Sequence, residues 1–290
     1  MRSEYDDFFD KIDLPVDFRA AAAPLCRRFE TEYPRELDAL TEDPDPRSVY
    51  ALCDKAGVER DLGMLAVGIL LGIRAHGTYR AKGIDDEVYI ASMRELRVWG
   101  LTCLRERGHI GFYEWGWFTN FLSAGIVRLG RLEFHEIPFH IPGREGDSYA
   151  HAGLCTKTGD RVVNIHIPED GPLDPALVQD AFRRAYRYFG RSGPALFVCD
   201  SWLLWPGNYD FLPEDSNIRA FMDCFHILSR DDRRFAGDLW RVFGHRDSYD
   251  PASLPRDTGL RRAMADYLAA HDGVTGTGYG VFTFDGERIL

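Results

Sequence analysis

The stretch RVVNIHIPEDGPLDPALVQDAFRRAYRYF, residues 161–189, decides the fold class of the chain. From Val163 to Ile167 apolar and polar side chains alternate, which is typical of a β-strand. Asp174 is a favoured helix N-cap residue and Pro175 suits the first helical position, so we predict a helix over 174–189. The apolar run Ala195–Cys199 then supplies another strand. A strand, a helix and a strand in succession indicate a mixed α/β sheet domain.

Outward from this unit the periodicity differs on the two sides. Further strands are predicted at Arg128–Phe139, Phe225–Arg230 and Tyr279–Phe284, the last followed by a turn at Asp285-Gly286. Upstream, residues 8–108 repeat apolar side chains at helical spacing. We therefore predict an α+β protein with an all-helical domain over 1–124 and a sheet domain over 125–290. Residues 141–159 are rich in Gly, Pro and Asp without periodicity, which predicts a long loop or lid.

Composition restricts the classes of function. The 290 residues include 35 Lys+Arg and 46 Asp+Glu, a formal charge of −11, which opposes binding to nucleic acid or an anionic membrane. The N-terminal residues lack the pattern of a secretory signal, and the apolar run Leu62–Ile73 is too short to span a bilayer. Six scattered cysteines have no zinc spacing and are expected to be reduced. We expect a cytoplasmic protein with a small-molecule substrate; the oligomeric state is left open.

The strands also predict a polar patch. Asn164 and His166 share one face of their strand, and Glu133 and His135 share one face of Arg128–Phe139. If the two strands pair, these four side chains converge. The apolar parity of Arg128–Phe139 changes after His135, so we expect a β-bulge there. The patch is either a site where an imidazole moves a proton or an ordinary solvated sheet face.

Other candidates carry alternatives. Cys199 follows a buried strand and is a possible nucleophile, whereas Ser201 suits either catalysis or a helix cap. Aromatic residues such as Trp117 and Trp202 either pack in the core or line an apolar pocket. The irregular spacing of the histidines at 135, 140, 151 and 166 argues against a metal site, and we predict none.

Taken together, several blocks resemble a bacterial family described as acyltransferase-domain proteins, with a helical N-terminal acyltransferase domain and a GNAT-like C-terminal domain. The resemblance spans nearly the whole chain. The blocks are Tyr113-Glu114-Trp115-Gly116-Trp117, Arg128-Leu129-Gly130-Arg131-Leu132-Glu133-Phe134, Asn164-Ile165-His166-Ile167-Pro168, Gly171-Pro172-Leu173, Ser201-Trp202-Leu203-Leu204 and Ser216-Asn217-Ile218.

The resemblance implies transfer of an acyl group from acyl-CoA or acetyl-CoA to an amine, without a metal. It places the proton acceptor at Glu133 or His166, with Cys199 and Ser201 as further catalytic candidates. Gly171 and Leu173 are the expected contacts of CoA. The expected substrate pocket comprises Trp117, Arg131, Asn164, Trp202 and Asn217.

One feature departs from GNAT enzymes. Their pyrophosphate signature, Arg or Gln followed by G-x-G or G-x-A, is absent at the junction of strand and helix, where this chain has Glu169 and Asp170. Asp174 is expected to cap its own helix. The alternative hypothesis is therefore a non-catalytic protein that binds a small metabolite or peptide on a GNAT-like fold.

Overall fold

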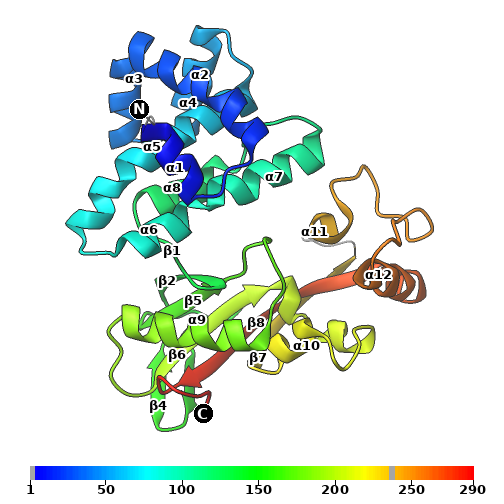
Figure 1. Ribbon diagram of the computed structural model, residues 1–290. Coiled ribbons are helices and arrows are strands. Elements are labelled where there is room, and N and C mark those ends of the chain that lie inside the picture. Colours follow the sequence, from blue (N-terminus) through cyan, green and yellow to red (C-terminus); the bar gives the residue numbers. More distant parts are fainter. Residues whose placement is uncertain (1–3, 235–238) are drawn as a thin grey trace. The chain divides into compact units, whose positions relative to one another are not determined.

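The computed structural model describes residues 4–234 and 239–290. The chain divides into two compact units, Met1–Arg128 and Leu129–Leu290 (Figure 1). The first is helical and the second is built around a sheet, as the α+β prediction requires.

The helical unit contains eight helices over the described residues. They are α1 (Glu4–Lys11), α2 (Val16–Glu32), α3 (Pro34–Glu42), α4 (Pro46–Ala56), α5 (Arg60–Ala81), α6 (Asp86–Met93), α7 (Glu95–Arg107) and α8 (Trp115–Leu122).

The centre of this unit is α5, around which the other helices pack. Its 22 residues include an 18-residue window that is long and apolar enough to cross a membrane, with a mean hydropathy of 1.3, yet 67% of that window is buried inside the protein. Glycines bring its neighbours close: a Cβ atom on Gly68 would lie 2.9 Å from a methyl carbon of Leu96. The apolar run Leu62–Ile73 lies within this largely buried helix.

The sheet unit contains a six-stranded sheet in the order β1-β2-β5-β6-β8-β7. Its strands are β1 (Val127–Leu129), β2 (Leu132–Pro138), β5 (Arg161–His166), β6 (Ala195–Ser201), β7 (His226–Arg234) and β8 (Val274–Phe284); β1 begins just before the division between the units. The helices are α9 (Pro175–Tyr188), α10 (Asn217–Met222), α11 (Leu239–Phe243), α12 (Gly259–Ala270) and the 3-10 turns η1 (Trp202–Leu204) and η2 (Pro206–Asp210). Strands β5 and β6 pair in parallel, whereas the pairs β2–β5, β6–β8 and β7–β8 are antiparallel, so the sheet is largely antiparallel.

One face of the sheet is covered by α9 through aromatic packing. The ring of Phe182 on α9 lies 4.7 Å from that of Phe282 and 6.2 Å from that of Phe197. Phe134 on β2 meets Phe197 edge to face at 6.4 Å. As predicted, Asp174 caps α9 and Pro175 is its first residue.

The opposite face carries a second apolar cluster and the β3–β4 hairpin. Strands β3 (Ser148–His151) and β4 (Leu154–Lys157) pair with each other, and Tyr149 and Leu154 pack on the cluster. The cluster consists of Phe139, Ile141, Val162, Leu196, Val198, Tyr279 and Val281. The predicted loop over 141–159 is therefore wrong in part, because Ala152 and Gly153, both at positive φ, form a tight turn between two short strands.

Two details of the predicted strands also need correction. The segment Arg128–Phe139 is interrupted by a turn at Gly130, whose φ is +73°, so it forms both β1 and β2. No bulge occurs near His135, because the register from Glu133↔His166 to Pro138↔Arg161 is continuous. The change of parity arises because both faces of the sheet are covered, so alternation of apolar and polar residues no longer marks a single buried face.

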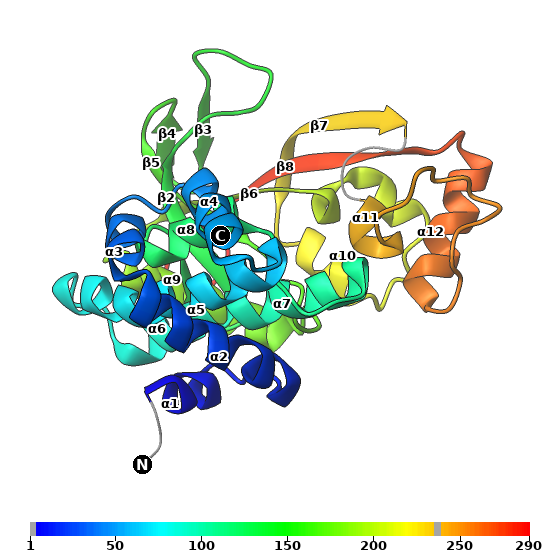
Figure 2. The same cartoon turned by 90° about the horizontal axis from the view of Figure 1, so that it is seen from above.

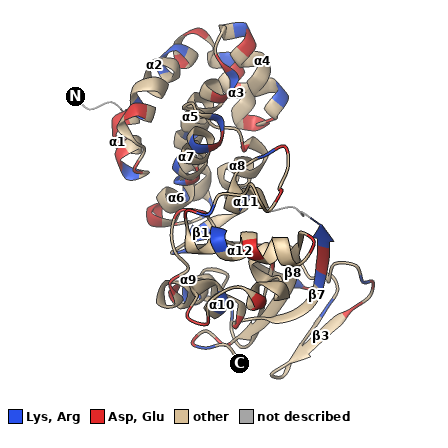
Figure 3. Ribbon diagram, turned by 90° about the vertical axis from the view of Figure 1, so that its right-hand side faces the viewer, with Lys and Arg blue, Asp and Glu red and all other residues tan. Residues whose placement is uncertain are grey.

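The outer ends of β7 and β8 extend as a two-stranded ribbon (Figure 2). Glycines on β8 admit the segment after β6: a Cβ atom on Gly278 would lie 2.1 Å from the carbonyl oxygen of Leu204. The outer end of β7, residues 230–234, carries Arg and Asp side chains together (Figure 3). The Trp205 indole donates a 2.6 Å hydrogen bond to Asp232 on this ribbon.

Candidate functional site

The predicted polar patch forms where β2 and β5 pair. Glu133 lies opposite His166, and His135 lies opposite Asn164. Directly opposed residues of antiparallel strands share a face, so all four side chains project from the side of the sheet that α9 does not cover. The predicted pairing of the two strands is confirmed.

The two histidines of the patch are in direct contact. Their rings stack with centroids 4.9 Å apart and an angle of 5° between the planes. Nε2 of His166 lies 3.0 Å from Nδ1 of His135 and 3.0 Å from Nδ2 of Asn164. Since the amide nitrogen only donates, Nε2 of His166 is the acceptor of that contact. Asn164 therefore holds His166 in one orientation and one tautomer.

Burial keeps this pair neutral. It lowers the pKa of His166 to about 3, with a further contribution from His135. Burial also lowers the pKa of His135, followed by the charge of Arg161. Glu133, opposite His166, is 1% exposed. The patch thus combines two uncharged imidazoles with a buried carboxyl group, which is a combination suited to receiving a proton.

The strands diverge beside this patch. The described ladder between β5 and β6 contains only Val163↔Phe197 and Asn164↔Val198, although both strands continue beyond it. Open α/β sheets bind ligands where parallel strands separate at their carboxyl ends, so this separation is the place where a ligand is expected. His166 ends β5 at this point.

Tyr279 and Asp200 lie on the same face of the sheet, on the two strands that follow β5. They lie opposite each other on β8 and β6, and Val198, two residues before Asp200, is level with Asn164. The phenol oxygen of Tyr279 is buried without a hydrogen-bond partner in the described part of the chain. Burial raises its pKa, and the charge of Asp200 adds to this effect. Tyr279 therefore keeps its proton. Tyr279 was not predicted as a site residue from the sequence, although it is the one large polar residue in the glycine-rich segment 274–281.

Arg131 holds the β5–α9 loop, residues 167–174, in place. Its guanidinium donates to the carbonyl oxygens of Gly171 and Pro172, the latter at 2.8 Å, and lies 3.7 Å from Asp170. The side chain of Arg131 is 7% exposed, so it positions the loop and does not line an open pocket as expected.

This loop does not fit a diphosphate at the N-terminus of α9. The Asp174 carboxylate already accepts hydrogen bonds from the amides of Ala176 and Leu177, at 2.8 and 3.2 Å. Pro175 has no amide hydrogen to offer. Gly171 has neither a positive φ nor a close neighbour, so no backbone constraint requires glycine there, and Leu173 is buried.

The remaining candidates lie elsewhere. Cys199 is fully buried, burial raises the pKa of its thiol, and its position in β6 faces away from the polar patch, so the expected nucleophile is wrong. Ser201 accepts from the amide of Leu203 at 3.2 Å, as a cap. Trp202 packs against the cluster formed by α11 and α12, and Asn217 is exposed at the start of α10. Trp117 belongs to the helical unit, where its indole donates to Glu95 at 2.9 Å.

The four histidines at 135, 140, 151 and 166 do not form one group. Of the four near the hairpin, the structure brings His135 and His166 together, whereas His151 stacks edge to face on His226 at 4.9 Å and His140 is exposed. All six cysteines are free.

Comparison with known proteins assigns both halves of the chain. Residues 126–282 match the GNAT-like C-terminal domain family, and residues 4–124 match the N-acyltransferase N-terminal domain family. No curated protein matches the chain.

Solved structures share the fold. One is described as an acyltransferase in complex with decanoyl-CoA and teicoplanin, with a TM-score of 0.75 and 21% identity over 98% of this chain and 88% of the other. Another, an acyltransferase mutant in complex with octanoyl-CoA, has a TM-score of 0.71 and 22% identity over 97% and 88%. The chain therefore belongs to the family that joins an N-acyltransferase N-terminal domain to a GNAT-like C-terminal domain.

Proposed function

We propose that the chain is an N-acyltransferase that moves an acyl group from an acyl-CoA thioester to an amine, at the polar patch of the sheet unit. Membership of the family supports the reaction class. The neighbours solved with decanoyl-CoA, octanoyl-CoA and teicoplanin support a CoA thioester as donor and a small molecule as acceptor. The single observation that carries the proposal is the stacked His135–His166 pair beside the point where β5 and β6 separate.

Acyl transfer to an amine requires removal of a proton from nitrogen. The amine attacks the thioester carbonyl, a C–N bond forms, the C–S bond breaks, and one proton leaves the nitrogen. With a pKa of about 3, His166 is too weak a base to hold that proton alone at neutral pH. His135 is less deeply enclosed, so in our proposal it receives the proton while His166 and Asn164 fix its position.

Glu133 and Tyr279 complete the assignment. The buried carboxyl group opposite His166 stabilises the positive charge that develops on the histidine pair. The leaving thiolate needs a proton, and Tyr279, which retains its phenol proton on the same face, is the proposed donor. Cys199 has no part in this scheme, so no acyl-enzyme forms on it.

The start of α9 does not bind the diphosphate at the nucleotide end of CoA. Since the cap at Asp174 occupies the amides at the start of α9, the diphosphate of the donor is not held there, and we assign no step to that end of the molecule. Binding energy for the donor then comes from the pantetheine and acyl portions.

The proposal is tested by measuring acylation of a panel of amines with decanoyl-CoA and octanoyl-CoA, following release of free CoA thiol. We expect His135→Gln and Glu133→Gln to lower kcat by roughly 10²-fold or more, the usual contribution of a positioned acid or base. His140→Gln, an exposed histidine in the same unit, is the matched control. Equal rates in all three variants would contradict the assignment.

The second candidate function, a non-catalytic metabolite-binding protein, is favoured by the capped and acidic β5–α9 loop. It predicts that acyl-CoA binds without turnover for every amine in the panel. Under that outcome Glu133→Gln and His135→Gln change affinity alone.

A further inference from the structure

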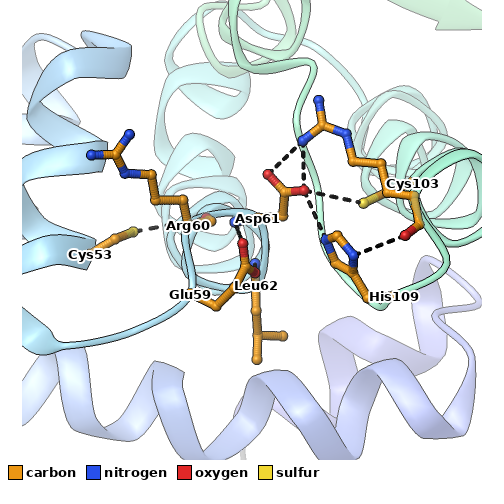
Figure 4. A network of polar contacts seen from close by, with 8 residues as sticks. Cys53, Glu59, Arg60, Asp61, Leu62, Cys103 and His109 are labelled. Atoms are coloured by element: carbon orange, nitrogen blue, oxygen red, sulfur yellow. Dashed lines mark hydrogen bonds and ion pairs between the residues drawn. The ribbon is translucent and has the colours of Figure 1, made fainter.

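A second cluster of reactive side chains lies in the helical unit, separate from the polar patch. It joins Asp61, near the start of α5, to Cys103 in α7 and to His109 in the connection between α7 and α8 (Figure 4). Asp61 and Cys103 are buried, whereas the His109 side chain is 46% exposed. One oxygen, one sulfur and one nitrogen atom from these residues lie within 4.8 Å of one another.

Both ring nitrogens of His109 face hydrogen-bond acceptors. Nε2 lies 2.9 Å from the Asp61 carboxylate, and Nδ1 lies 3.2 Å from the carbonyl oxygen of Arg107. Both neighbours accept and neither donates. When Nδ1 donates to the carbonyl oxygen, Nε2 turns its lone pair toward the carboxylate, and a cation placed between them would contact both groups.

We propose that these three residues form a binding site for a divalent zinc-like cation, with Asp61, Cys103 and His109 as its ligands. Carboxylate, thiolate and imidazole are the ligand types that zinc takes, and a hydrogen bond from the other ring nitrogen to a backbone carbonyl is the usual support of a zinc-bound histidine. Tetrahedral bonds of about 2.0 to 2.3 Å place ligand atoms roughly 3.3 to 3.7 Å apart. The His109 nitrogen, 2.9 Å from the Asp61 oxygen, therefore moves slightly away from it, and the Cys103 sulfur, 3.9 Å from the same oxygen, moves slightly closer.

Charge and protons balance in this exchange. When the cation binds, the Cys103 thiol releases its proton to solvent and becomes the thiolate ligand, while Asp61 and His109 each donate a lone pair. No oxidant or reductant is required. Because a proton leaves, affinity rises with pH; the other charged group near the cluster is Glu59, with Tyr113 alongside.

Metal binding requires Arg107 to release at least one oxygen of the Asp61 carboxylate. Its guanidinium now donates to both oxygens of Asp61, at 2.8 and 2.6 Å. It also lies 4.0 Å from the centre of the Tyr113 ring, a cation–π contact that remains when the carboxylate turns to the metal. The side chain is 44% exposed, so it can also be solvated. His109 at the surface provides the entry path.

The test uses the reduced full-length chain, freed of metal by EDTA, and titrates it with Co²⁺ as a spectroscopic probe. We expect a thiolate-to-cobalt absorption band in the near ultraviolet and tetrahedral bands in the visible, both abolished by Zn²⁺. Cys103→Ser is expected to remove the near-ultraviolet band, and His109→Gln to weaken Co²⁺ binding at least about tenfold. Two matched controls are expected to behave as the unaltered chain: Cys155→Ser, at an exposed free thiol, and His76→Gln, whose His–Asp contact at 2.7 Å lacks a thiol.

Folding of each variant is checked by circular dichroism without metal. Absence of the near-ultraviolet band from the unaltered chain at saturating Co²⁺ would overturn the proposal, since the cluster would then be an ion pair that only anchors the α7–α8 connection. A band that survives Cys103→Ser, or disappears with Cys155→Ser, would overturn it equally, because the ligand sulfur would lie elsewhere.

Discussion

Acidification is expected to destabilise the sheet unit through His166. In the unfolded chain an imidazole titrates near its ordinary pKa of about 6.5. In the folded chain burial holds the pKa of His166 at about 3. The folded state therefore resists protonation that the unfolded state accepts, and stability falls as the pH drops below about 6.5 and continues to fall until the folded pKa is reached.

The magnitude follows from these two values. At about pH 5 the unfolded imidazole is protonated and the folded one is not, which costs about 1.4 kcal/mol for each of roughly 1.5 pH units, or about 2 kcal/mol. Relative to about pH 7.5, where both states are neutral, this is the expected loss due to His166. His135, whose pKa is also lowered, acts in the same direction.

The assay is amide hydrogen exchange in β5 and β6, because it reports the opening free energy of the sheet unit by itself. His166→Asn removes the titrating group, so the variant is expected to lose about 2 kcal/mol less than the unaltered chain between about pH 7.5 and about pH 5. His140→Asn, at an exposed position, is expected to lose as much as the unaltered chain. If His166→Asn shows the full loss on acidification, His166 titrates normally and the neutral pair is refuted.

Three further predictions concern the loop and the discarded nucleophile. Because the start of α9 is capped by Asp174, decanoyl-pantetheine is expected to support transfer with kcat/KM within about tenfold of decanoyl-CoA; a loss far beyond that would show that the nucleotide end is recognised. Arg131→Met removes the hydrogen bonds from Arg131 to the β5–α9 loop, so we expect faster amide hydrogen exchange over 169–173. Unchanged exchange would show that other contacts hold the loop. Cys199→Ala is expected to keep full transferase activity and to cost about 1 kcal/mol of stability, measured by urea unfolding; loss of activity in a folded variant would return the thiol to the mechanism.

Local sequence rules predicted the parts of the fold that depend on neighbouring residues. Asp174 and Pro175 placed the start of α9, and the alternation in Arg161–Ile167 placed β5, because capping and strand parity are set over a few residues. The pairing of β2 with β5, and with it the polar patch, followed from their closeness along the chain.

Features that depend on distant residues were not predictable in this way. The bulge expected at His135 was inferred from a change of apolar parity along the strand, but the register is continuous. The change of parity arises because the β3–β4 hairpin covers the far face of the sheet, and the composition of 141–159 did not predict that hairpin. Tyr279 shares the face of the patch only through the pairing of β6 with β8, about eighty residues along the chain. The cluster at Asp61 and His109 likewise joins residues 48 positions apart.

The most direct test of the central claim is a crystal structure of the chain with a thioether analogue of decanoyl-CoA, which binds without reacting. We predict that the methylene group replacing the thioester carbonyl lies where β5 and β6 separate, within contact distance of His135 and Tyr279. An analogue whose corresponding carbon lies on the α9 side of the sheet, or away from the sheet unit, would contradict it.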